Sequence, residues 1–145
     1  MDAAGCHQRG SADGNQEKSL YRAILVYEEQ GLRFMKFGRH NAGRQTCISL
    51  ANPAALVLGH TKMLLGALYL NPEPRKILII GLGGGTLQSA LQKILPEAKI
   101  DTVELEPSVV SVAKRFFGFF PGAQSSVFIE DGRVFVKRAP KQGKR

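Results

Sequence analysis

The sequence has little of what disulfide-linked, membrane-spanning and secreted proteins require. It contains two cysteines, Cys6 and Cys47, too few for a disulfide framework or a cysteine-based metal site, so we expect two free thiols. No apolar run approaches the ~20 residues of a membrane-spanning helix, and residues 1–18 contain no apolar segment typical of a secretory signal. These absences predict a cytoplasmic protein with no membrane partner and no metal cofactor.

The composition is that of a globular domain. Hydrophobic residues make up 43% of the 145 positions and charged residues 22%, which excludes collagen-like, mucin-like and wholly disordered chains. A chain of this length can bury roughly 68–70% of its unfolded surface. A stable core is therefore possible without disulfides.

The net charge of +8 is concentrated at one end of the chain. Residues 133–145 contribute +6 and include no acid, whereas residues 1–132 carry 14 basic and 12 acidic side chains. A short basic run beside a nearly neutral body is typical of a solvated tail. We therefore expect no specific nucleic-acid partner.

Changes in hydrophobic pattern divide the chain into five segments. Residues 1–18 have few apolar groups and predict a flexible leader. Residues 21–27 and 32–37 read as a hairpin, with a third short strand over 46–50. Asn52 and Pro53 predict a helix start. The expected segments are the leader (1–18), a β-hairpin domain (19–52), a linking helix (53–75), the first half of a nucleoside-binding domain (76–138) and a basic tail (139–145).

The second half of the chain has the alternating pattern of a parallel sheet. The aliphatic run 76–80 predicts a strand buried on both faces, and further strands are expected over 99–105 and 126–129. Helical segments after residue 86 and after Pro107 connect them as crossovers. The predicted fold class is α/β, a small N-terminal β-domain followed by a partial doubly wound parallel sheet.

A glycine-rich loop joins the first of these strands to a helix. Gly81, Gly83 and Gly85 can adopt positive φ and let a ligand approach the backbone at the helix N-terminus. A tight packing turn explains a lone glycine cluster equally well. The two interpretations stay open from the loop alone.

Acidic residues at the ends of the next two strands favour a ligand site. Glu104 lies where a carboxylate can accept both hydroxyls of a ribose. Asp131, followed by Gly132, ends the third strand and could accept a hydrogen bond from an adenine amino group. The alternatives are a solvated carboxylate at Glu104 and a simple Asp-Gly turn.

Together these motifs resemble one family. The stretch KILIIGLGGGTLQSALQKILPEAKIDTVELEPSVVSVAKRFFGF, followed by EDGRVF, resembles the spermidine-synthase-like polyamine aminopropyltransferases, which have a Rossmann-like methyltransferase fold. The resemblance implies that Glu104 holds the ribose, Asp131 the adenine, and Gln45 another part of the ligand. It also suggests His60 as a residue near a polyamine channel, although packing is the alternative for a histidine on a helix.

Two departures from the family pattern limit what the resemblance implies. Gly84 stands where the family's loop has an aspartate facing the donor's amino group, and no acidic residue follows Asp131 to serve as the family's general base. We therefore expect a C-terminally truncated, inactive relative. Its expected ligand is decarboxylated S-adenosylmethionine, or a related nucleoside such as methylthioadenosine, with a polyamine as candidate second substrate and homo-oligomers as candidate assemblies. The alternatives are a methyltransferase that uses S-adenosylmethionine and a non-catalytic binding or regulatory protein.

Overall fold

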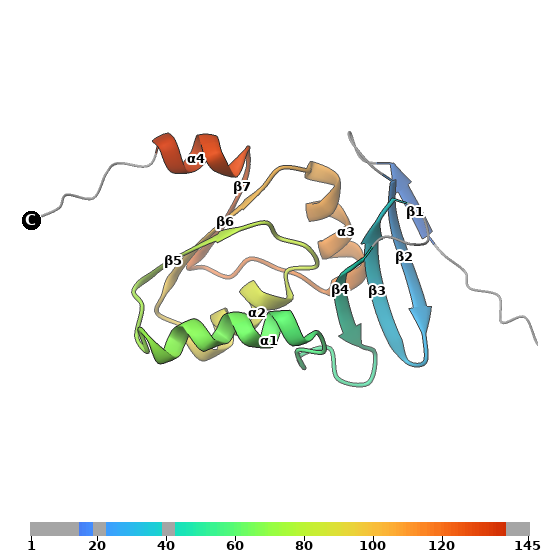
Figure 1. The fold of residues 1–145 in the computed structure, drawn as a ribbon, viewed down its shortest axis with the longest axis horizontal. Coiled ribbons are helices and arrows are strands. Elements are labelled where there is room, and N and C mark those ends of the chain that lie inside the picture. Colours follow the sequence, from blue (N-terminus) through green and yellow to red (C-terminus); the bar gives the residue numbers. More distant parts are fainter. Residues whose placement is uncertain (1–14, 19–22, 39–42, 139–145) are drawn as a thin grey trace, which may run out of the picture.

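Two sheets of different type make up the protein (Figure 1). The computed structural model describes residues 15–18, 23–38 and 43–138. The N-terminal sheet contains β1 (Asn15–Lys18), β2 (Ala23–Glu29), β3 (Leu32–Phe37) and β4 (Arg44–Ser49). The remaining elements are α1 (Gly59–Leu64), the 3-10 helix η1 (Leu65–Tyr69), β5 (Lys76–Ile80), α2 (Thr86–Ile94), β6 (Lys99–Glu104), α3 (Pro107–Phe117), β7 (Ser125–Ile129) and α4 (Gly132–Arg138).

The N-terminal sheet is an antiparallel meander of the four strands in chain order. The β2–β3 turn is formed by Gln30 and Gly31, which both have positive φ, 51° and 74°. Two such residues make the tight hairpin turn whose twist matches its strands. The predicted hairpin is confirmed. Cys47 on β4 is a buried free thiol whose pKa is raised by burial, whereas Cys6 lies outside the described residues.

Strand β1 lies inside the segment that we expected to be a flexible leader. It pairs with β2 from Asn15 opposite Val26 to Lys18 opposite Ala23. Main-chain hydrogen bonds hold such a strand, so its polar sequence gives no apolar pattern that could reveal it. The leader expectation is therefore wrong for residues 15–18.

The linking helix begins later than its sequence signals predict. Asn52 lies in a turn, where its N–H donates to Ser49 Oγ over 3.2 Å and its carbonyl accepts from the N–H of Ala55. Helix α1 starts at Gly59, and the preceding Leu58 offers no side-chain cap. Asn52 and Pro53 thus help to turn the chain from β4 toward the second sheet. The local sequence Asn-Pro is compatible with both such a turn and a helix start.

The second sheet is parallel and has the order β5-β6-β7. Helices α2 and α3 are the crossovers between its strands, which confirms the predicted α/β class with a partial parallel sheet. In the part of the chain that the structure describes, no helix has the length and apolarity needed to cross a bilayer.

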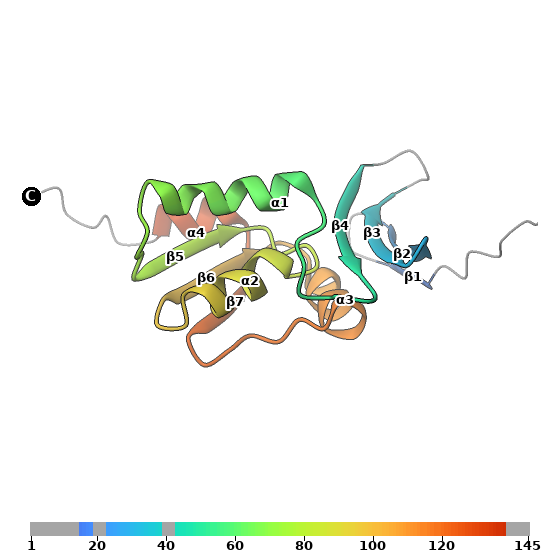
Figure 2. The ribbon, with the colours of Figure 1, turned by 90° about the horizontal axis from the view of Figure 1, so that it is seen from below.

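One hydrophobic core joins the two sheets. It takes Ile24 and Met35 from the N-terminal sheet and Val112 and Phe117 from α3, and all four are at most 7% exposed. Both views place α3 between the sheets (Figures 1 and 2). Arg33 on β3 adds a polar link, since its guanidinium donates to the carbonyl of Phe116 over 2.6 Å. The antiparallel sheet is therefore packed directly against α3, the helix that connects β6 and β7 of the second sheet.

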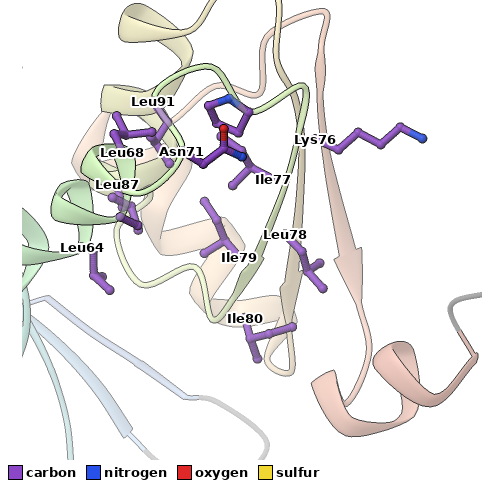
Figure 3. Close-up of a pocket in the computed structure, with 12 residues that line it drawn as sticks. Leu64, Leu68, Asn71, Lys76, Ile77, Leu78, Ile79, Ile80, Leu87 and Leu91 are labelled. Atoms are coloured by element: carbon purple, nitrogen blue, oxygen red, sulfur yellow. The ribbon is translucent and has the colours of Figure 1, made fainter. Parts of the chain in front are cut away.

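Strand β5 is an edge strand and is only half buried. Ile77 and Ile79 point into an apolar groove of about 420 Å³ beside α1, η1 and α2 (Figure 3), whereas Leu78 and Ile80 are 45% and 57% exposed. The expectation of burial on both faces is wrong. An aliphatic run indicates that a strand favours burial. It does not indicate whether the described chain supplies a second layer to cover the strand.

The uncovered edge of β5 predicts self-association. Unpaired main-chain groups beside aliphatic side chains favour pairing with another chain, and a charge placed there opposes it. We expect the oligomer of Leu78→Lys to have a dissociation constant about tenfold above that of the wild-type oligomer, which corresponds to ~1.4 kcal/mol. Light scattering over a dilution series measures both constants. Leu50→Lys, at a 39% exposed leucine directly after β4 of the other sheet, is the matched control. A wild-type protein that stays monomeric with a sharp melt would contradict the prediction.

Candidate functional site

The glycine loop, residues 81–85, connects β5 to α2 through a left-handed backbone. Gly81, Gly83 and Gly85 have φ of 92°, 57° and 75°. Residues with a Cβ pay roughly 1–2 kcal/mol for such conformations, so the glycine pattern follows from the shape of the turn.

The two sides of this loop meet different surroundings. At Gly81 an added Cβ would have no heavy atom within 4 Å. At Gly84 it would overlap Thr46 Cγ2, and at Gly85 it would overlap the ring of Phe119. Gly83 is similarly close to Thr46, with 2.9 Å from the added Cβ to Oγ1. The packing-turn interpretation therefore holds for Gly83–Gly85, and the open-backbone interpretation holds for Gly81.

Glu104 lies at the end of β6 and is 9% exposed. Its Oε2 accepts a hydrogen bond from the N–H of Leu82 over 2.8 Å, and its Oε1 accepts from the N–H of Glu106 over 3.0 Å. The carboxylate therefore fixes the glycine loop to the end of the neighbouring strand. A solvated strand-end carboxylate, the alternative considered from the sequence, does not describe it.

A pocket of about 280 Å³ lies where β5, β6 and β7 end. Three of its lining residues, Gly81, Glu104 and Asp131, lie at the carboxyl ends of three neighbouring strands. The full lining consists of Ile80, Gly81, Val103, Glu104, Leu105, Glu130, Asp131, Gly132 and Arg133. The carboxyl ends of parallel strands commonly carry the ligand site of an open α/β sheet.

Asp131 caps the start of α4 and pairs with Arg133. Its Oδ1 accepts from the Arg133 N–H over 2.8 Å, and its Oδ2 lies 2.9 Å from the Arg133 guanidinium. These hydrogen bonds lower the pKa of Asp131 from 3.8 to about 2. Next to it, Gly132 allows close approach, since a Cβ there would lie 2.6 Å from Ile80 Cγ2.

The structure does not bring every predicted residue to this pocket. The side chain of Gln45 is exposed on β4 and its Nε2 makes a 3.5 Å contact with the carbonyl of Gly43. His60 is exposed on α1, so it is not a core histidine. Gly83 and Gly85 line the packed side of the loop. Gly81, Glu104, Asp131 and Gly132 are the predicted residues that share the pocket.

Sequence reasoning missed Thr46 and the pairing role of Arg133. Thr46 follows Gln45 on β4, and no local pattern signals its contact with a loop 38 residues away. From the sequence, Arg133 belongs only to the basic run 133–145 and the EDGRVF motif and has no assigned role, although the Asp-Gly-Arg order could have indicated a helix cap with a neighbouring cation. Among the described residues, no cluster of His, Cys, Asp and Glu could hold a metal ion.

Comparison with known proteins supports the resemblance found in the motifs. The spermine/spermidine synthase domain model matches residues 58–144, more than half of the chain. The chain belongs to the spermine/spermidine synthase family. A polyamine aminopropyltransferase of this family from Vibrio vulnificus (strain CMCP6) is 40% identical over 134 residues, which is 90% of this chain and 44% of that protein. The chain spans slightly less than half the length of three polyamine aminopropyltransferases that it matches, 44%, 43% and 46%.

Solved structures give the same fold. A spermidine synthase in complex with the transition-state analogue AdoDATO aligns with a TM-score of 0.64 at 22% identity, over 85% of this chain and 42% of that one. Human methyltransferase-like protein 13 in complex with SAH aligns with a TM-score of 0.52 at 34% identity, over 56% of this chain and 40% of that one. The spermine/spermidine synthase family member described by this sequence therefore has a methyltransferase-like α/β fold.

The contacts of Glu104 predict that this residue stabilises the fold without any ligand. An amide nitrogen cannot accept a hydrogen bond, so Glu104→Gln leaves one buried N–H unpaired. We expect a loss of about 2 kcal/mol in the free energy of unfolding, measured by urea titration. Glu97→Gln, at an exposed carboxylate just before β6, is the control, with a change within about 0.5 kcal/mol. Equal effects of the two substitutions would contradict the prediction.

The lowered pKa of Asp131 predicts an acid-dependent contribution to stability. Because the pKa is lower in the folded protein, the stabilisation is complete above about 3.8 and is lost as pH falls toward about 2. We expect Asp131→Asn to be less stable than wild type at pH 6, with a difference that shrinks as pH falls through about 2 and vanishes near pH 1, measured by urea titrations across this range. A difference that is the same at pH 6 and near pH 1 would show that the charge of Asp131 is not its cause.

Proposed function

We propose that the chain binds an adenosine-type ligand in the pocket at the ends of β5, β6 and β7, with the ribose on Glu104 and the adenine on Asp131. The observation that carries this proposal is the meeting of an open glycine backbone at Gly81 with two carboxylates from neighbouring strand ends. Membership of the spermine/spermidine synthase family supports it, as do structural neighbours solved with the nucleoside-type ligands AdoDATO and SAH.

Glu104 retains the capacity to bind ribose hydroxyls while it holds the loop. Each carboxylate oxygen has two lone pairs, and each accepts one N–H in the structure. Two acceptor positions remain for two hydroxyl donors. The same carboxylate can then position both the glycine loop and the sugar.

Asp131 offers an ionised acceptor at neutral pH, since its pKa is about 2. Arg133 already occupies part of the carboxylate, but that arginine side chain is 87% exposed. An exposed ion pair contributes little free energy, so the guanidinium can shift at little cost when an amino group approaches. The pocket volume of about 280 Å³ is just below that of typical ligand sites, which range over roughly 300–1,000 Å³. We therefore propose weak binding by this chain alone.

We propose aminopropyl transfer as the reaction of the longer relatives. A base takes a proton from the acceptor amine, the amine nitrogen bonds to the propyl carbon, and the carbon–sulfur bond breaks to release methylthioadenosine. The 145-residue sequence has no Asp or Glu after Asp131 and has glycine at position 84. We propose that this chain by itself does not catalyse the step.

Methyl transfer is the second candidate. Human methyltransferase-like protein 13, solved with SAH, shares 34% identity over 56% of this chain, and the uncharged loop at Gly84 would not repel a donor that keeps its carboxylate. Comparing the affinities for S-adenosylmethionine and its decarboxylated form separates the two candidates. Tighter binding of the intact form favours the methyltransferase.

The first functional prediction concerns binding. We expect Glu104→Gln and Asp131→Ala to weaken methylthioadenosine binding about ten- to hundredfold, because each removes a charge-assisted hydrogen bond of ~1.5–3 kcal/mol. Isothermal titration calorimetry measures the affinities. Asp101→Asn is the control, since Asp101 also lies on β6 but does not line the pocket. A melting curve for each variant separates lost binding from lost folding, and wild-type affinity in both pocket variants would refute the site.

The second concerns turnover. We expect no aminopropyl transfer from labelled decarboxylated S-adenosylmethionine to putrescine above a boiled control. General-base catalysis contributes ~10²–10⁴-fold, and substrate positioning is missing as well. The Vibrio vulnificus relative at its full length serves as the positive control in the same assay. Turnover by the 145-residue chain would show that another residue acts as base.

A further inference from the structure

Thr46 of the N-terminal sheet contacts the glycine loop of the parallel sheet. It is 3% exposed, and its Oγ1 accepts a hydrogen bond from the N–H of Gly84 over 2.7 Å. Its methyl group occupies the space beside the Gly84 α-carbon, where an added Cβ would overlap it. Thr46 therefore both pairs a buried amide of the loop and fills the volume that a side chain at position 84 would need.

The main-chain amides of the glycine loop donate hydrogen bonds to acceptors from both sheets. The N–H of Gly81 donates to the Val103 carbonyl over 2.7 Å, and the N–H of Leu82 donates to Glu104. Both of these acceptors are on β6. Thr46 is the acceptor for the Gly84 amide and comes from the other sheet. The loop is thus held on one side by β6 and on the other by β4.

We propose that Thr46 is a positioning residue for the adenosine-type pocket, an inference that rests on the function proposed for that pocket. By fixing Gly84 and excluding a side chain there, Thr46 sets the path of the loop. The path of the loop in turn places the open Gly81 peptide at the pocket rim. It also places the Leu82 amide, which orients the Glu104 carboxylate. Thr46 does not line the pocket, so it acts through these groups rather than on the ligand.

Two substitutions separate the hydroxyl from the methyl group. Thr46→Val keeps the shape and removes the acceptor of the Gly84 amide, whereas Thr46→Ser keeps the acceptor. Thr102→Val is the matched control, because Thr102 is also buried and its hydroxyl donates to the side chain of Gln88 over 2.7 Å, not to a main-chain group of the loop. Both Thr→Val substitutions keep the shape of a buried threonine and remove one hydrogen-bonded hydroxyl, so a general loss of stability affects these two variants similarly.

The first readout is ligand affinity by calorimetry with methylthioadenosine. We expect Thr46→Val to weaken binding about tenfold, since a buried N–H loses its partner, and Thr46→Ser and Thr102→Val to stay within about threefold of wild type. Equal losses in Thr46→Val and Thr102→Val would overturn the positioning role, because they would reflect stability alone.

The second readout needs no ligand. We expect hydrogen exchange of the Gly84 amide, followed by NMR in the ligand-free protein, to become about tenfold faster in Thr46→Val than in Thr102→Val. If exchange changes as expected but the wild type binds no nucleoside, the proposed function fails and the loop contact stands. If exchange at Gly84 is the same in both variants, the role of Thr46 is refuted whatever the ligand data show.

Discussion

The pairing of two buried amides in the glycine loop is the constraint on which the rest of the structure depends. A left-handed turn takes its main-chain N–H groups out of helix and strand ladders, and buried N–H groups without acceptors are costly. Glu104 accepts from Leu82 and Thr46 accepts from Gly84, and these two acceptors come from different sheets. The loop is therefore the point at which the antiparallel and parallel halves must fit together, and the shared core around α3 keeps them in that relation.

This constraint explains why the two sides of one short loop differ. Its Gly83–Gly85 side is filled by Thr46, Phe117 and Phe119, while its Gly81 side stays open toward Asp131. The packing turn and the open backbone, alternative interpretations of the sequence, are the two faces of the same turn. The glycine loop of this chain thus combines a steric requirement from the protein interior with an open backbone at the pocket.

The pocket is formed by three strand ends, whereas strand β5 of the same sheet is partly exposed. Three strand ends suffice to bring Gly81, Glu104 and Asp131 together, so the candidate site is formed within the described residues. Among the described strands, β5 pairs only with β6, and it exposes Leu78 and Ile80. Nucleoside binding is consequently a property to be tested on this chain, whereas group transfer is a proposal for relatives of about twice its length.

The sequence by itself determined the features that depend on near neighbours in the chain. Hydrophobic runs and turn residues fixed the hairpin and the alternation of strands and helices, and the need for positive φ fixed the glycines of the loop. Glu104 and Asp131 were found because strand ends converge in any parallel sheet. Only the tertiary structure decided that β1 pairs with β2, that α1 begins at Gly59 and that Thr46 holds the loop. Thr46 and Gly84 are 38 residues apart in the sequence, and the polar strand β1 is held by main-chain pairing that needs no apolar pattern. Neither periodicity nor residue type at one position carries that information.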